Sequence, residues 1–516
     1  MLTILLFSCQ SPDKNIFTPA EEDTATENLW PRDPMYDALA ETLSQEFYEL
    51  GSQRSAFALF SMDEILYAEG FGVEPNGREI VPETLFRIGS VTKMLSAIAL
   101  LQEMDTNGIS TEDTLVSQVP SFQIQENPEF STQISFRDLL QHSSGIVDSI
   151  TISASEGDEA LSAFVNDEMA ENYYFMNPPG IFHNYSNPGY VLVGYGAESI
   201  SGRYYMEKMK SDVFEPLGMN RSFFLSDDVI EDGNYATGLS DGSNGFFQGQ
   251  LLPPEEYDNG WARPAGFLWS NVVDMANVGM FFLNGDESVL SDSLREEMLA
   301  PQISNNILGE HSHYGYGWGN ESGFWRNNTF IEGTYNHHSG AVPGYSTTLL
   351  IWPEKGMGMV AMAAVDGAYI SDALYEALEL YDLPQSGDPM PSDIYYDSGD
   401  NDDYTGTFFD PNNIGEVIIT NENGTLTVEA TTLDEYDIPY GTTMSPYTKD
   451  NLIWEVQDYP FIMSMIRDDN GQPQYFANRY FVATRQAEED NTKERRVTNK
   501  PIIQKPQKTP RHLRPF

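Results

Sequence analysis

The sequence predicts an α+β domain built on one antiparallel sheet, followed by a small all-β domain. Two patterns of strand, turn and strand lie far apart in the chain, and helix and loop patterns fill most of residues 110–310 between them. The first pattern joins Ala56–Phe60 to Ile65–Ala68, and the second joins Tyr345–Ile351 to Met357–Ala363. Because strands stand at both ends of this region, we expect one sheet whose halves come from opposite ends of the domain.

Two helices are predicted near the first hairpin. A helix-like run from Pro34 to Tyr48 precedes it, and a second run follows Ser90. Asn107-Gly108 predicts the end of the second helix, because glycine favours the position after the last turn. Ser90 is therefore expected at a helix N-terminus. The apolar positions with helical spacing in this run are Val91, Met94, Leu95, Ile98, Leu101 and Met104.

The last quarter of the chain reads as a separate unit. Residues 385–403 are rich in Pro, Gly and Asp, which predicts a linker after a folded domain at residues 34–384. Beyond it, Asn423-Gly424 separates two strand-like runs, and Asn-Gly favours the type I′ turn of a β-hairpin. We therefore expect a small all-β domain at residues 404–486, and a basic disordered tail at residues 487–516.

The composition is that of a folded, strongly acidic protein. With 516 residues, 40% of them hydrophobic, the chain can bury at least two cores, and wholesale disorder is excluded. The formal charge is −52; the segment from residue 491 onward carries +7, so residues 1–490 carry −52 − 7 = −59. Such a body repels nucleic acid and anionic lipid, so no nucleic-acid partner is expected. Solubility alone explains the charge equally well.

The single cysteine, Cys9, ends an apolar start of the chain. Leu6-Phe7-Ser8-Cys9 resembles the lipobox of a bacterial lipoprotein, in which the cysteine becomes the lipidated first residue. Residues 1–9 are therefore interpreted as a lipoprotein signal and residues 10–33 as an acidic tether, which predicts attachment to the cell envelope through an N-terminal lipid. No Lys or Arg precedes Cys9, so an accidental resemblance is the alternative.

Three short motifs, in order, supply the groups of an acyl-transfer enzyme. A serine hydroxyl is a poor nucleophile at neutral pH, and Lys93, three residues after Ser90 on one helix face, can act as its base. The N–H at the helix start can help to hold the developing oxyanion. Ser-x-x-Lys is common by composition, so it carries little weight alone. The motifs are Ser90-Val91-Thr92-Lys93, Tyr185-Ser186-Asn187 and His338-Ser339-Gly340.

The second and third motifs add a proton relay, an amide and a close backbone approach. Tyr185 can relay the proton, and Asn187 can hydrogen-bond a substrate amide; taken singly, a core tyrosine and a turn residue explain them as well. The small residues that follow His338 let the backbone approach an acyl group, and an N–H just after Gly340 can be the second oxyanion donor.

Four of the seven histidines raise the question of a metal site. Their spacing fits no strong zinc pattern, and no cysteine can assist, so no metal or other cofactor is predicted. The four are His311, His313, His337 and His338.

Together with their flanking phrases, the three motifs resemble the serine β-lactamase and penicillin-binding-protein superfamily, nearest its class C, DD-carboxypeptidase and esterase branch. The resemblance covers roughly residues 35–384 and implies a β-lactamase-like fold, with an antiparallel sheet flanked by helices and a mainly helical subdomain. The phrases are Leu85–Ser90, Arg137–Gly145, Phe214–Met219, Pro264–Ser270 and Tyr314–Trp318.

The resemblance also implies roles for single residues. Ser90 is the acylated nucleophile, Lys93 its base or proton partner, and Tyr185 the residue that passes the proton to the leaving group. Whether Lys93 or Tyr185 is the acylation base stays open. The N–H groups of Ser90 and Ala341 form the implied oxyanion hole. The implied substrate-binding residues are Asn187, His338, Ser339, Gly340 and Ala341.

One departure from the family pattern bears on the substrate. His338 stands where β-lactamases have the lysine of Lys-Thr-Gly, and a histidine is mostly neutral at pH 7. In the family, His-x-Gly goes with D-amino-acid peptidases and esterases, and the small β domain is similar to the barrel-like additions of some of these peptidases. We therefore expect a serine hydrolase that acts through an acyl-enzyme on a D-amino-acid peptide, like a DD-carboxypeptidase, or on a small ester. The alternatives are a β-lactamase and a catalytically idle binding or scaffold protein.

Overall fold

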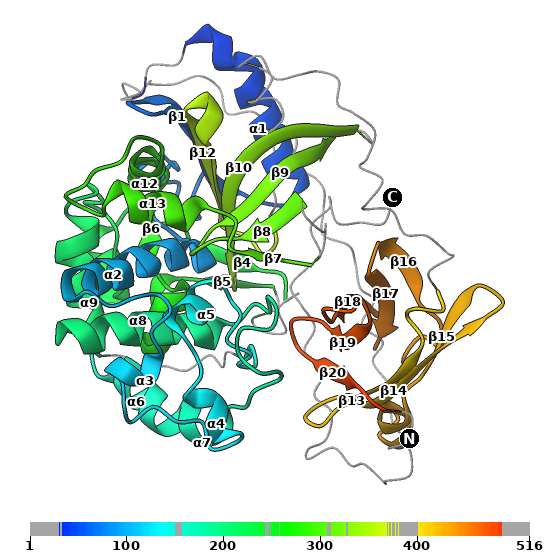
Figure 1. Cartoon of the computed structure of the whole chain (residues 1–516). Coiled ribbons are helices and arrows are strands. Elements are labelled where there is room, and N and C mark those ends of the chain that lie inside the picture. Colours follow the sequence, from blue (N-terminus) through cyan, green and yellow to red (C-terminus); the bar gives the residue numbers. More distant parts are fainter. Residues whose placement is uncertain are drawn as a thin grey trace, which may run out of the picture.

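A computed structural model describes most of the chain between residues 33 and 487 (Figure 1). The predicted signal with Cys9, nearly all of the tether, residues 385–400 of the linker and residues 488–516 of the tail lie outside the described residues. None of the helices described is both long enough and apolar enough to cross a membrane. The described residues are 30, 33–149, 157–242, 247, 249–256, 259–306, 311–326, 329–368, 370, 373, 377, 380 and 401–487.

An eight-stranded antiparallel sheet forms the centre of the first domain, in the order β2-β1-β12-β11-β10-β9-β8-β7. β1 pairs with β12, so that Ser55 lies opposite Ala363, and this confirms that the two halves of the sheet come from opposite ends of the domain. Its strands are β1 (Arg54–Ser61), β2 (Ile65–Gly72), β7 (Ile303–Ser304), β8 (Ser312–Tyr314), β9 (Gly319–Arg326), β10 (Thr329–Val342), β11 (Tyr345–Trp352) and β12 (Met357–Ala363).

Helices cover both faces of this sheet (Figure 1). The predicted N-terminal helix is α1 (Asp37–Glu49), and its apolar residues Leu39, Leu43 and Phe47 pack on one face. The other face packs against α12 (Val272–Asn284), where Phe60 of β1 joins a core of helix side chains. The sheet is therefore buried on both faces, which explains why β1 and β12 are nearly continuous apolar runs.

A mainly helical region lies between β2 and β7 in the sequence, as predicted for roughly residues 110–310. Its helices are α2 (Thr92–Asn107), α3 (Leu115–Gln118), α4 (Pro128–Ser131), α5 (Phe136–Leu140), α6 (Ala160–Ala163), α7 (Ala170–Asn172), α8 (Asn187–Ser201), α9 (Tyr205–Lys208), α10 (Ser226–Asp232), α11 (Arg263–Gly266), α12 and α13 (Asp292–Leu299). Short strands pair as β3 (Phe86–Arg87) with β6 (Trp269–Ser270), and β4 (Gly238–Ser240) with β5 (Gln250–Leu252).

The helix after Ser90 begins and ends where the sequence predicts. Ser90 lies in a 3₁₀ turn, Gly89–Val91, that leads directly into α2. Gly108 caps the other end with φ 65°, a left-handed conformation that glycine adopts without steric cost. Lys93 is thereby fixed on the first turn of α2, one turn from Ser90.

The C-terminal domain is a second antiparallel sheet of eight strands that is nearly closed, in the order β15-β14-β13-β20-β19-β18-β17-β16. Asn423 and Gly424 both have positive φ, as the predicted type I′ turn requires. Buried Asn401 donates to Gly424 O at 2.9 Å, so packing of this domain reaches back beyond residue 404. Its elements are β13 (Gly406–Asp410), β14 (Gly415–Glu422), β15 (Thr425–Glu429), α15 (Thr431–Glu435), β16 (Ser445–Thr448), β17 (Asn451–Val456), β18 (Tyr459–Arg467), β19 (Pro473–Ala477) and β20 (Val482–Arg485).

The two domains meet beside the catalytic motifs. Phe182, three residues before Tyr185, packs against Ala477 and Val482 in a small apolar cluster. Asn451 Nδ2 donates to Asn306 O at 2.8 Å across the same boundary. The turn between β19 and β20 is thus held over the active-site side of the first domain.

Candidate active site

The Lys93 ammonium nitrogen lies at the centre of the site. Its Nζ is within hydrogen-bonding distance of Ser90 Oγ at 3.0 Å, Asn187 Oδ1 at 2.7 Å and Ala265 O at 2.6 Å. The side chain is fully buried, and burial is the largest cause that holds the pKa of Lys93 well below its usual range. A lysine in this state can be neutral and accept the proton of Ser90.

Tyr185 lies against the same serine. A hydrogen bond with Ser90 and the charge of Arg479 both lower the pKa of Tyr185, but burial outweighs them and keeps that pKa above its usual range. Lys93 Nζ lies 4.9 Å from the centre of the phenol ring. The Tyr185 hydroxyl is therefore protonated at neutral pH and is placed to give its proton to a leaving group.

The backbone of β10 approaches the nucleophile closely at Gly340. A Cβ atom at Gly340 would lie 1.9 Å from Ile88 O and 2.9 Å from Ser90 N, and one at Gly89 would lie 2.6 Å from Ala341 N. Both predicted oxyanion donors, the N–H groups of Ser90 and Ala341, therefore lie at the contact between the 3₁₀ turn and β10. The predicted need for small residues in this motif has a direct steric cause.

His338 is buried and neutral. Its Nδ1 lies 2.7 Å from Ser339 O, which can only accept, so Nδ1 carries the proton and Nε2 accepts from the Tyr314 hydroxyl at 2.9 Å. Burial and the nearby Lys93 lower the pKa of His338 to about 3. The strand that carries a lysine in β-lactamases thus supplies no positive charge in this chain.

Two charged residues that the sequence reasoning missed complete the site. Asp148, 4% exposed, accepts from both the backbone N and the side-chain Nδ2 of Asn187, at 2.9 Å each. Its other oxygen accepts from Arg479 Nε, which comes from the turn between β19 and β20. The Arg479 guanidinium carbon also lies 4.5 Å from the centre of the Tyr185 ring. The C-terminal domain therefore contributes a cation to the catalytic centre.

The His142 ring packs against the Tyr185 ring. Its ring centre lies 4.0 Å from that of Tyr185, and its Nδ1 accepts from Ser186 N at 3.0 Å. Burial is the main cause that holds the pKa of His142 well below its usual range, so the ring is neutral. His142 belongs to a phrase that carried the family resemblance, but its sequence context gave no sign of its contact with Tyr185.

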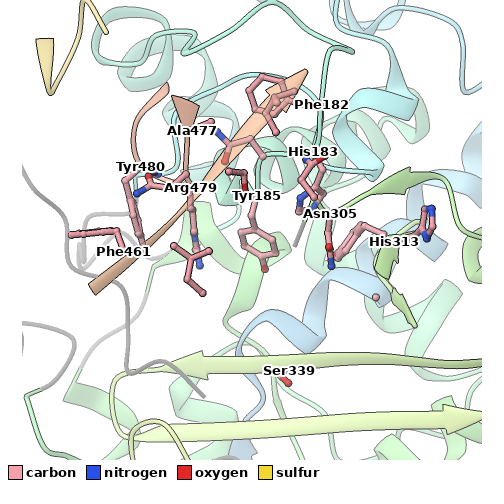
Figure 2. A pocket seen from close by; sticks show the side chains of 18 of the residues that line it. Phe182, His183, Tyr185, Asn305, His313, Ser339, Phe461, Ala477, Arg479 and Tyr480 are labelled. Carbon is pink, nitrogen blue, oxygen red and sulfur yellow. Dashed lines mark hydrogen bonds between the residues drawn. The ribbon is translucent and has the colours of Figure 1, made fainter. Parts of the chain in front are cut away.

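A cavity of about 470 Å³ opens between the two domains above these groups. Figure 2 shows Arg479 and Tyr185 side by side in it, with Ser339 on the strand opposite. The size suits a small molecule or a short peptide segment. Much of the wall is apolar and is supplied by β18 and the β19–β20 turn; these lining residues include Phe461, Ile462, Ile466, Ala477 and Tyr480.

The four histidines considered for a metal do not converge. His338 is held by Tyr314 as described, His337 Nε2 lies 3.4 Å from Glu321 Oε1, and His311 Nδ1 lies 2.9 Å from Ser322 Oγ. Over the residues that the structure describes, no group of three or more His, Cys, Asp or Glu side chains could hold a metal ion.

All the predicted site residues in the described part of the chain come together here. Ser90, Lys93, Tyr185 and Asn187 form one hydrogen-bonded group, and the residues of the third motif with Ala341 form the strand beside it. One detail differs from expectation. The Asn187 amide, expected to face a substrate, has its Oδ1 on Lys93 and its Nδ2 on Asp148. Cys9 lies outside the described residues.

Fold and site together are those of a protein of the β-lactamase-like class. The model of the Beta-lactamase family matches residues 51–381, which is more than half of the chain, and the chain belongs to this family. Its members are generally serine hydrolases, although some are non-catalytic.

Individual relatives agree with this assignment at low identity. Beta-lactamase-like protein 2 of Dictyostelium discoideum is 27% identical over 274 residues, 52% of this chain and 49% of the relative, so this chain spans about half of that protein. Penicillin-binding protein 4 of Amycolatopsis lactamdurans is 24% identical over 352 residues, 66% of this chain and 87% of the relative.

Solved structures extend the likeness to the second domain. The crystal structure of SurE with D-Leu has a TM-score of 0.62 at 19% identity, over 88% of this chain and 99% of that one. The octameric penicillin-binding protein homologue from Pyrococcus abyssi has a TM-score of 0.56 at 23% identity, over 87% and 99%. At these identities the likeness shows the fold alone.

Proposed function

We propose that this protein is a serine hydrolase that cleaves a peptide ending in a D-amino acid with a free carboxylate, through an acyl-enzyme on Ser90. The observation that carries the substrate class is Arg479. His338 is neutral, whereas the Arg479 guanidinium enters the cavity beside Tyr185 and is 41% exposed there. Within the described part of the chain, its two terminal nitrogens donate no hydrogen bond, so they are available to a carboxylate.

The reaction uses the site as follows. Ser90 Oγ attacks the substrate carbonyl carbon while its proton moves to Lys93 Nζ. The lowered pKa of Lys93 leaves its amine neutral and able to accept the proton, whereas the raised pKa of Tyr185 keeps its hydroxyl protonated. The N–H groups of Ser90 and Ala341 hold the oxyanion. The bond from carbon to the leaving amine then breaks, and the amine takes a proton through Tyr185. A water molecule attacks the ester carbonyl, releases the acid and returns a proton to Ser90 Oγ.

The exposed Arg479 guanidinium also ranks the alternative substrates, a small ester and a β-lactam. A small ester needs no cation, so Arg479 would have no role in binding it. A β-lactam carries a carboxylate, and Arg479 could receive it, but the cavity wall is shaped by a second domain and is largely apolar. One structural neighbour was solved with D-Leu, a free D-amino acid, which supports trying this chemical class first.

The test compares two substrates that differ only at the carboxylate. An N-acylated peptide ending in D-Ala-D-Ala is offered as the free acid and as the C-terminal amide, to the wild type and to Arg479→Gln. We expect the wild type to favour the acid by about 10- to 100-fold in kcat/KM, the size of one or two charge-assisted hydrogen bonds, and the variant to lose this preference.

Two controls separate chemistry from binding. Ser90→Ala should abolish turnover and any covalent adduct in intact-mass spectra, and activity retained in a folded variant would refute the nucleophile assignment. Arg467→Gln removes an arginine of the same domain that pairs with Asp450 and does not line the cavity, so it should keep the preference. Equal rates for acid and amide in the wild type would exclude the proposed carboxylate recognition.

A further inference from the structure

We propose that Asp148 is a positioning residue that orients Asn187 toward Lys93, and that Arg479 balances its charge, so that the C-terminal domain is an electrostatic part of the catalytic centre. This inference rests on the proposed function, because it concerns the activation of Ser90. It assigns a role to a residue that touches neither Ser90 nor Lys93 in the described contacts.

The orientation argument follows from the hydrogen bonds. A carboxylate only accepts, so Asp148 Oδ1 must receive the Nδ2 group of Asn187, and this leaves Asn187 Oδ1 facing Lys93 Nζ. In the flipped amide, an NH₂ group would face the Lys93 donor and a carbonyl would face the carboxylate. Both contacts would be repulsive. The bond from Asn187 N to the same Oδ1 fixes the start of α8 as well.

The charge argument concerns the proton equilibrium of Lys93. After burial, the largest effects on the pKa of Lys93 are the Asp148 carboxylate, which raises it, and the Arg479 guanidinium, which lowers it. The other groups near Lys93 are Ser90, Asn187 Oδ1, the Ala265 carbonyl, the rings of Tyr185 and Tyr190, and the neutral His142 and His338. The ion pair therefore sets two charges near the base whose effects on the pKa of Lys93 oppose each other.

Removing each charge alone gives shifts of opposite sign. Asp148→Asn should lower the pKa of Lys93, and Arg479→Gln should raise it. The double variant should return toward the wild type, which a purely structural role does not predict. Asp148→Asn should also slow Ser90 activation by about 10- to 100-fold, because the Asn187 amide loses its fixed orientation.

The experiment follows Ser90 reactivity without relying on a substrate. A fluorophosphonate is incubated with the full chain from pH 5 to 10, and the rate of Ser90 labelling is read by intact-mass spectrometry. The acid limb of the profile should move to lower pH in Asp148→Asn, to higher pH in Arg479→Gln, and back in the double variant. Each pH unit corresponds to a tenfold change in rate on that limb.

Matched controls remove the same two kinds of charge, one carboxylate and one guanidinium, from an ion pair within the C-terminal domain. Asp450→Asn and Arg467→Gln break the 2.6 Å ion pair of that domain and should leave the profile unchanged. If Asp148→Asn does not fold, Arg479→Gln still gives a signed prediction. Labelling that shifts in the same direction in both single variants, or in neither, would overturn this inference alone. No labelling of the wild type at any pH would refute the proposed function and the inference with it.

Discussion

Substituting Gly340 by alanine tests whether β10 is held against the nucleophile. The added Cβ would lie 1.9 Å from Ile88 O, 2.9 Å from Ile88 C and 2.9 Å from Ser90 N. All three are backbone atoms, so no side chain can turn aside to relieve the contact. The strand must move away from the 3₁₀ turn, and the N–H of Ala341 moves with it.

The expected magnitude combines a catalytic and a structural part. Loss of one oxyanion donor lowers kcat by about 10²- to 10³-fold, or about 3–4 kcal/mol of transition-state stabilisation. Overpacking at a buried contact costs a further 1–3 kcal/mol or so in the free energy of unfolding. Steady-state kinetics on a p-nitrophenyl ester measure the first, and urea unfolding measures the second.

Gly266→Ala is the matched control. A Cβ at this position would also approach the 3₁₀ turn, but at 3.4 Å from Gly89 C and 3.6 Å from Ser90 N, which are ordinary contacts. The control should keep kcat within a few fold. The reasoning would be refuted if Gly340→Ala kept both the wild-type kcat and the wild-type unfolding midpoint, or if both variants lost activity equally.

Three further predictions concern the surroundings of the site. Burial lowers the pKa of His338 to about 3 and that of His183 to about 4. Below the ordinary histidine pKa of 6.5 the unfolded state therefore binds more protons than the folded state, so the free energy of unfolding should fall as pH drops from about 6.5 toward 4. A denaturation series over this pH range should show a shallower fall in His338→Gln. Tyr314→Phe leaves His338 Nε2 without its donor and should destabilise by about 1–3 kcal/mol in urea unfolding, whereas an unchanged midpoint would contradict the tautomer assigned above. Phe182→Ala removes the apolar contact with Ala477 and should separate the unfolding of the two domains in calorimetry; a single unshifted transition would argue against this contact as their main link.

Local patterns were enough to predict two hairpins of the first sheet and one hairpin of the C-terminal domain. Short apolar runs on either side of polar turns marked β1, β11 and β12. Asn423-Gly424 marked a turn whose positive φ values few other residues adopt. The order of elements, with strands at both ends of the domain and helices between them, predicted one sheet with halves from both ends. The pairing of β1 with β12 confirms this. The strands β7, β8 and β9 were not predicted, and neither was the part of β10 before His338. β7 and β8 carry too few residues for a periodic pattern.

The sequence predicted the nucleophile, its lysine and the tyrosine because each belongs to a motif with fixed spacing. Asp148 and Arg479 have no such spacing, since 331 positions separate them and only the docking of two domains joins them. Nothing near Arg479 in the sequence distinguishes it from a surface arginine. The signal in the sequence that could have led to Arg479 is His338 itself. A neutral histidine in place of the lysine of Lys-Thr-Gly leaves any positive charge at the site to be supplied from elsewhere in the chain.

The position of Arg479 assigns two tasks, donating an N–H to the oxyanion and supplying a positive charge, to two different segments of the chain. In this chain β10 contributes the Ala341 N–H and a neutral histidine, while the positive charge sits on the turn between β19 and β20. The Ser90 to Lys93 hydrogen bond lies wholly within α2 and the turn before it, so a shift in domain docking leaves it intact. The same shift would move Arg479 away from Asp148 and thereby change both the pKa of Lys93 and the proposed binding of a substrate carboxylate. Docking of the second domain is therefore expected to affect carboxylate-bearing substrates most strongly, and simple esters only through the pKa of Lys93.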